Sequence, residues 1–101
     1  MNVQIQTVHF DADSKLLEHV TAKMEKLKTF HDKIIGLDVY LKLDNMSQQV
    51  RDKVAEIKVY VPKHSYFVKH QSKTFEESFD IAFNSLVSQV KRQKEKQMAY
   101  N

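Results

Sequence analysis

The sequence predicts an α+β fold, a two-layer sandwich in which two helices cover one face of a four-stranded, mainly antiparallel sheet. Four short segments alternate apolar with polar residues, which is the pattern of half-buried strands. Two longer segments repeat their apolar residues at helical spacing. The order along the chain is β-α-β-β-β-α, so we expect residues 1–101 to form a single domain with a frayed end over 97–101.

The first two predicted elements are a short strand and an amphipathic helix. Residues 3–8 (VQIQTV) alternate in polarity, which places Val3 and Ile5 on the same face of a strand. Asp13 then stands at the N-cap position of a helix predicted over residues 14–30. The apolar face of this helix consists of Leu16, Leu17, Val20, Met24 and Leu27.

Three further strands are predicted in the middle of the chain. Two of them have one apolar face each, formed by Leu37, Val39, Leu41 and Leu43 and then by Ala55, Ile57, Val59 and Val61. The polar segment 44–52 between these strands has no apolar periodicity and is typical of a loop. Residues 62–64 (PKH) predict a tight turn, because proline presets φ and cannot continue a ladder. Residues 65–71 therefore return as an antiparallel fourth strand.

The last predicted helix has the clearest pattern in the chain. Thr74 is placed to cap it, and Glu76 and Glu77 lie in its first turn, where negative charge is favoured. Its apolar residues form one stripe, which we assign to the core: Phe75, Phe79, Ala82, Phe83, Leu86 and Val90.

The net charge of the protein is concentrated near the end of this last helix. Residues 91–96 (KRQKEK) contain four cations and one carboxylate, which accounts for the whole net charge of +3. Clustered cations neutralise several phosphates at once and release their counterions, so the segment indicates nucleic-acid binding. The alternative is a solvated helix end, since cations are also favoured near the C-terminal pole of a helix.

Other cations lie where they could extend such a surface. In the first helix, His19, Lys23 and Lys26 form a strip beside the apolar face, from which their long side chains can reach outward. Lys69 and Lys73 lie on either side of the end of the fourth strand. A strip of this kind is equally consistent with a solubilising flank.

The face of the sheet opposite the helices is expected to be polar. Its charges are mixed, as in a solvated surface, and come from Asp38, Lys42, Glu56 and Lys58. Tyr40 and Tyr60 are predicted to point outward on adjacent strands. Such tyrosines could stack on RNA bases, or they could pair across the strands and only stabilise the sheet.

The sequence lacks the residues that most catalytic and cofactor sites require. With one glycine there is no glycine-rich phosphate loop, and without cysteine there is no thiolate nucleophile, disulfide or sulfur ligand. The five histidines lie on different predicted elements without the spacing of a metal site. We therefore expect no enzymatic activity, no cofactor, no metal and no small-molecule substrate.

The sequence also lacks the pattern of a secreted or membrane protein. Its N-terminus has no signal-peptide pattern, and no apolar run approaches the roughly 20 residues that cross a bilayer. These observations predict a cytoplasmic protein without a membrane partner.

Both predicted helices contain sequence patterns that are longer than a short motif. The first contains VTAKMEKL followed by HDKI (20–27 and 31–34), and the last begins with FEESFD and ends with QVKRQKEK. In these patterns, and in the three strands between them, nearly the whole chain resembles the ribosome hibernation promoting factor family. Its members are also called ribosome-associated inhibitors or sigma-54 modulation proteins. The family's Ile-Asp pair, leucine, glutamine and alternating basic residues correspond to Phe79, Asp80, Leu86, Gln89, Arg92, Lys94 and Lys96.

The resemblance implies a fold similar to the double-stranded RNA-binding domain, and binding to the small ribosomal subunit and its rRNA in the mRNA/tRNA channel. It assigns phosphate contacts to Lys23, Lys26, Arg92, Lys94 and Lys96. Two departures imply a weaker or shifted RNA surface: Glu76 replaces a usual tyrosine, and Ser88 replaces a common basic residue. The chain also looks like a short form without the dimerisation domain of long members, so we expect a monomer when it is free.

We therefore expect a ribosome-binding translation inhibitor that occupies the mRNA/tRNA channel and promotes ribosome hibernation under stress or in stationary phase. The RNA-binding residues that we expect are Lys23, Lys26, Lys69, Lys73, Lys91, Arg92, Lys94 and Lys96. Two alternatives remain open. One is a generic binder of double-stranded RNA, and the other is a protein-interaction module that presents its open sheet face or an edge strand.

Overall fold

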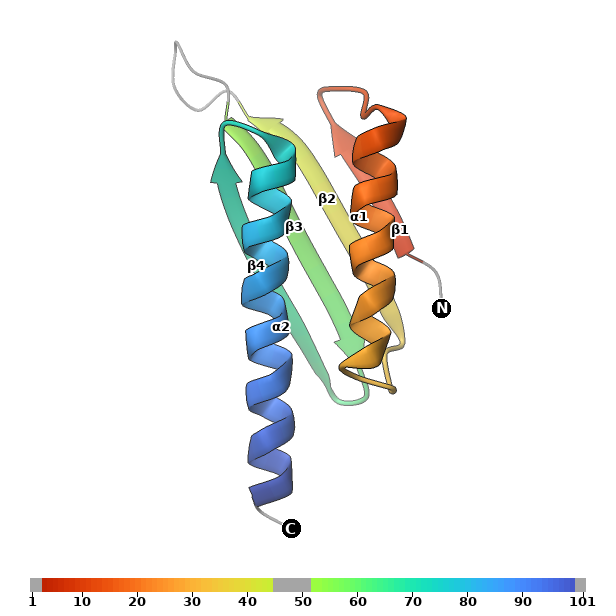
Figure 1. Ribbon diagram of the computed structural model, residues 1–101, viewed down its shortest axis with the longest axis vertical. Coiled ribbons are helices and arrows are strands. Elements are labelled where there is room, and N and C mark those ends of the chain that lie inside the picture. The colour runs from red at the N-terminus through yellow and green to blue at the C-terminus, as the bar shows by residue number, and fades with distance from the viewer. Residues whose placement is uncertain (1–2, 45–51, 100–101) are drawn as a thin grey trace.

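The protein has the predicted order of elements, as described by a computed structural model over residues 3–44 and 52–99. The elements are β1 (Val3–Val8), α1 (Ser14–Lys26), the 3-10 helix η1 (Leu27–Thr29), β2 (Gly36–Asp44), β3 (Asp52–Val61), β4 (His64–Ser72) and α2 (Phe75–Ala99). Both helices lie on one face of the sheet and run in the same direction (Figure 1). The predicted α+β two-layer fold is confirmed.

The sheet has the strand order β1-β2-β3-β4. β1 is parallel to β2, whereas β2, β3 and β4 pair as antiparallel neighbours. A parallel pair needs a crossover connection, which α1 supplies. Val39, Ile57 and Val68 are partners across three strands, and all are buried beneath the helices. The side chains directly before and after these residues in each strand point to the opposite side of the sheet. That side carries no helix (Figure 1).

The core lies between the helices and the sheet. Its fully buried members come from both layers and include Val20, Met24, Leu27, Leu37, Leu41, Ile57, Phe79 and Leu86. The prediction for Leu17 is wrong, because this residue is 36% exposed. It follows Leu16 directly and is therefore turned about 100° away from the buried face of α1.

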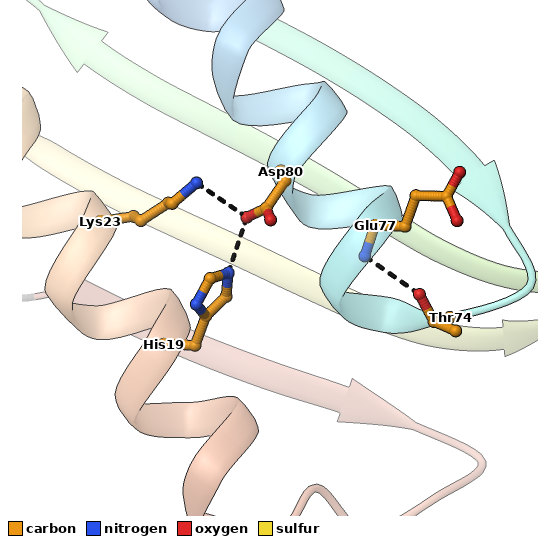
Figure 2. Close-up of polar contacts among 5 residues, drawn as sticks. All are labelled: His19, Lys23, Thr74, Glu77 and Asp80. Carbon is orange, nitrogen blue, oxygen red and sulfur yellow. Dashed lines mark hydrogen bonds and ion pairs between the residues drawn. The ribbon is translucent and has the colours of Figure 1, made fainter.

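Side-chain caps start both helices as predicted. The Asp13 carboxylate accepts a hydrogen bond from the Leu16 N–H at 2.8 Å, and the Thr74 hydroxyl accepts one from the Glu77 N–H at 3.1 Å (Figure 2). Each cap satisfies one of the backbone donors that a helix leaves unpaired in its first turn.

The first helix ends earlier than the predicted residue 30. Its regular part stops at Lys26, and the chain continues as the tighter helix η1. The Thr29 hydroxyl donates to the Lys26 carbonyl at 2.7 Å, and the Phe30 N–H donates to the Leu27 carbonyl at 3.0 Å. Such short-range bonds satisfy carbonyls at a helix C-terminus and close the last turn.

The antiparallel hairpin of β3 and β4 is confirmed, with a turn shorter than predicted. Val61 pairs with His64, so only Pro62 and Lys63 connect the strands, and β4 runs from His64 to Ser72. Lys63 has φ = 66°, which fits the third position of a type II turn after proline. At the other end of β3, Asp44 and Asp52 of the predicted loop 44–52 belong to strands, and residues 45–51 lie outside the described residues.

A buried hydroxyl fixes the start of α2 to the sheet. Ser78 is fully buried, and its hydroxyl donates to the Lys53 carbonyl of β3 at 2.5 Å and contacts the Ser72 hydroxyl of β4 at 2.8 Å. α2 is helical from there to Ala99, and the rest of the expected frayed end, residues 100–101, lies outside the described residues.

Candidate nucleic-acid interface

The C-terminal ends of both helices lie at the same end of the molecule (Figure 1). The turn between β3 and β4 and the segment between η1 and β2 lie at this end too (Figure 1). The Ile35 N–H donates to the Tyr60 carbonyl at 2.7 Å, which ties these two connections together. Six exposed cations belong to these four segments, with η1 counted as the end of the first helix, and we call them the basic end: Lys26, Lys28, Lys33, Lys63, Lys91 and Arg92.

The opposite end of the helical layer is acidic. Phe10, just before α1, stacks on Phe75 at the start of α2 with ring centroids 4.2 Å apart, so both helix N-termini meet there. Exposed carboxylates at these N-termini come from Asp11, Asp13, Glu76 and Glu77. Exposed charges of the opposite sign also lie at each end, Lys15 and Lys73 near the N-termini and Glu25 and Asp32 near the basic end. The balance is still negative at the helix N-termini and positive at their C-termini, as the helix dipoles favour. Such a field also turns the basic end toward a polyanion.

Two basic residues of α2 point to opposite sides of the helix. The Lys91 ammonium lies 4.9 Å from the centre of the Phe30 ring, on the side of η1. Arg92 lines a pocket of about 200 Å³ on the side of β4, together with His64, Tyr66, Gln89 and Gln93. The two cations thus widen the basic end in two directions. Lys94 and Lys96 follow in α2, and their side chains lie outside the described residues.

The Lys23 side chain forms an ion pair between the two helices. Its ammonium lies 3.0 Å from Asp80 Oδ1 of α2, and His19 Nε2 donates to the same oxygen at 2.6 Å (Figure 2). Burial alone would raise the pKa of Asp80, but the hydrogen bonds and charges of His19 and Lys23 outweigh it and hold the pKa below its usual value. Asp80 therefore stays ionised and neutralises part of the positive charge that the sequence suggests for this strip.

Lys26 differs from Lys23 in its surroundings. It is exposed at the last turn of α1, so its charge belongs to the basic end. Lys69 is exposed on the side of the sheet that carries no helix, and Lys73 is exposed between β4 and α2, near the acidic end. The structure thus gathers Lys26, Lys91 and Arg92 and leaves Lys69 and Lys73 elsewhere; RNA binding by each of them stays a prediction.

Sequence reasoning missed three cations of the basic end. Lys28, Lys33 and Lys63 are isolated in the sequence and join the cluster only through the fold. The order β-α-β-β-β-α could have indicated this cluster. The chain reverses direction from one element to the next, which places the C-terminal ends of both helices and the turn of the hairpin at the same end of the fold. Recognising it requires the directions of both helices, which periodicity alone does not provide.

Tyr40 and Tyr60 both face the uncovered side of the sheet, as predicted. They do not form a cross-strand pair: Tyr40 lies opposite Glu56, and Tyr60 lies opposite Gly36. The interpretation of these tyrosines as a stabilising pair is therefore wrong. The aromatic residue that sequence reasoning missed on this face is Phe67 of β4, which is 48% exposed.

Within residues 3–44 and 52–99, no group of three or more histidine, cysteine or acidic residues is placed to hold a metal ion. No helix in this part of the chain is long and apolar enough to cross a membrane.

Comparison with known proteins identifies the family. The family described as sigma 54 modulation protein / S30EA ribosomal protein matches residues 3–98. A ribosomal subunit interface protein from Coxiella burnetii has a similar structure, with a TM-score of 0.81, 17% identity, and coverage of 94% of this chain and 99% of that one.

The N-terminal domain of Protein Y from Thermus thermophilus is also similar, with a TM-score of 0.75, 24% identity, and coverage of 91% of this chain and 98% of that one. At these identities, both likenesses support the fold. No curated protein gives a significant match to the sequence. Because the family match covers nearly the whole chain, this protein belongs to the sigma 54 modulation protein / S30EA ribosomal protein family.

Proposed function

We propose that this protein binds the small ribosomal subunit through its basic end, occupies the channel for mRNA and tRNA, and so inhibits translation and promotes hibernation under stress or in stationary phase. The observation that carries the proposal is the gathering of six exposed cations from four separate segments at one end of the fold. Membership in the sigma 54 modulation protein / S30EA ribosomal protein family supports a ribosomal partner.

The physical basis is the attraction of clustered cations to rRNA phosphates. Each phosphate neutralised by a cation releases a counterion, so the logarithm of the binding constant falls with the logarithm of salt concentration by about 0.9 per contact on a duplex. Six contacts would weaken binding about a thousandfold between 50 and 200 mM salt. Inhibition by occupancy requires no bond to be broken, so the proposal includes no enzymatic activity and no cofactor.

The test is co-sedimentation of the purified protein with small subunits at 50 and 200 mM salt. We expect binding at low salt, a steep loss at high salt, and a further loss for Arg92→Glu. Lys15→Glu is the matched control, because Lys15 is exposed in the first turn of α1, near the acidic end, and undergoes the same change of charge. Equal binding by both variants would contradict the role of the basic end.

Channel occupancy is tested separately. Bound protein should reduce binding of initiator tRNA and mRNA to the subunit, and excess mRNA with tRNA should displace the protein. Strong competition by free duplex RNA would instead favour a generic binder of double-stranded RNA. The proposal places the protein in the cytoplasm with the ribosomes, as a monomer when free, which size-exclusion chromatography with light scattering would check.

A further inference from the structure

The side of the sheet that carries no helix has a hollow of about 440 Å³ at its centre. Residues from three strands line it: Tyr40, Lys42, Glu56, Lys58 and Phe67. β3 separates β2 from β4, so the backbones that carry Tyr40 and Phe67 lie about 10 Å apart across the sheet. The two aromatic side chains thus flank a floor that β3 supplies.

The rings that flank the hollow are partly open to solvent. Phe67 is 48% exposed although it is fully apolar, and Tyr40 is half-buried. A large apolar ring on an open sheet face gains little for folding, because folding removes only part of its surface from water. The exposed part of the Phe67 ring is instead available to pack against another planar group.

The floor and rim of the hollow are charged. The Lys42 ammonium pairs with Glu56 Oε2 at 2.7 Å, and the Glu56 side chain is only 14% exposed. Lys58 and Lys69 are exposed beside them, since Lys58 lies opposite Phe67 and Lys69 lies opposite Glu56. The hollow therefore combines aromatic rings with a fixed carboxylate and accessible ammonium groups.

This combination fits unpaired nucleotides. Aromatic rings stack on bases of any sequence, ammonium groups contact the backbone phosphates, and a carboxylate accepts hydrogen bonds from exocyclic amino groups. A duplex offers no free base faces to the rings. An apolar peptide would bury the charged floor without compensation.

We propose that the open face of the sheet binds single-stranded RNA, with Phe67 and Tyr40 stacking on bases and Lys58 and Lys69 contacting phosphates. This site is separate from the basic end, which lies at the C-termini of the helices (Figure 1). The protein thus holds a single strand on one surface while the other faces structured RNA.

The test uses the whole chain and an unstructured RNA of eight nucleotides. In spectra of the 15N-labelled protein, we expect the oligonucleotide to shift amide signals of β2, β3 and β4. Phe67→Leu and Tyr40→Leu should each weaken binding about tenfold, as for the loss of one base–aromatic stack. Phe67→Tyr should retain binding because it keeps the ring.

Tyr60→Leu is the matched control, since Tyr60 lies on the same face outside the hollow. Thermal unfolding verifies that each variant is folded. Shifts confined to the ends of α1 and α2, or equal binding by Phe67→Leu and wild type, would overturn the proposal. So would a photo-crosslink from position 67 to ribosomal protein alone in the subunit complex, because it would make this face a protein contact.

The two proposals can fail independently. Arg92→Glu should lose small-subunit binding while the octamer still shifts the amides of the open sheet face. Phe67→Leu should weaken binding of the octamer to that face about tenfold while small-subunit binding at low salt persists.

Discussion

Replacing Asp80 with asparagine tests the contact that joins the two helices. The change keeps the size of the side chain but removes the charge that faces His19 and Lys23 (Figure 2). The three side chains are each about one third exposed, so water screens their attraction. Each contact then contributes about 0.2–1 kcal/mol, and we expect Asp80→Asn to lower the free energy of unfolding by about 1 kcal/mol. For a domain of this size, that corresponds to a decrease in Tm of about 4–8 °C.

The pH dependence provides a second readout of the same contact. Folding lowers the pKa of Asp80 from its usual value of 3.8. A carboxyl with a lowered pKa contributes its full stability above the usual value and loses it as pH falls through the folded pKa. The stability difference between wild type and Asp80→Asn should therefore persist from neutral pH down to about pH 4 and shrink below it.

Urea unfolding followed by circular dichroism measures these differences. The set consists of wild type, Asp80→Asn, Lys23→Met and the double variant, which together isolate the pairwise energy. We expect a coupling between the two positions of about 0.2–1 kcal/mol. A coupling of zero, with a stability difference that does not change at acidic pH, would show that the ion pair does not form and refute the reasoning.

Three further outcomes are expected. Asp13→Ala removes the cap of α1 and should cost about 1 kcal/mol in urea unfolding, whereas Asp11→Ala, in the same segment, should cost little. Ser78→Ala leaves the Lys53 carbonyl without its donor and should cost about 1–3 kcal/mol in the same assay, and a near-neutral effect would contradict the buried bond. Lys28→Ala should reduce the salt slope of small-subunit binding by about one, and an unchanged slope would exclude Lys28 from the phosphate contacts.

Local patterns were sufficient to predict the elements of the fold. The apolar stripe of α2 from Phe75 to Val90 is buried as predicted, because its helical spacing forms one apolar face that packs into the core. The caps Asp13 and Thr74 depend on residues within three positions along the chain, so the sequence contains everything that they need. The early end of α1 depends on how Thr29 bonds back to the last turn, and apolar spacing does not report that.

The candidate site was less predictable, because it forms only by tertiary assembly. Lys63 and Lys33 are far apart in the sequence and belong to the same end of the molecule because the segment before β2 bonds to the end of β3. Lys23 has the helical position expected of an outward cation, but a carboxylate 57 residues away lies within 3.0 Å of its ammonium. Phe67 lies within a strand pattern that explains an aromatic residue without any functional role.

We propose that the basic end contacts rRNA in the mRNA/tRNA channel of the small subunit. A density map of the protein bound to the small subunit of its own host tests this most directly. We predict density in that channel, with Lys26, Lys91 and Arg92 within reach of rRNA phosphates and the acidic end turned away. Density outside the channel, or contacts made through the acidic end, would contradict it.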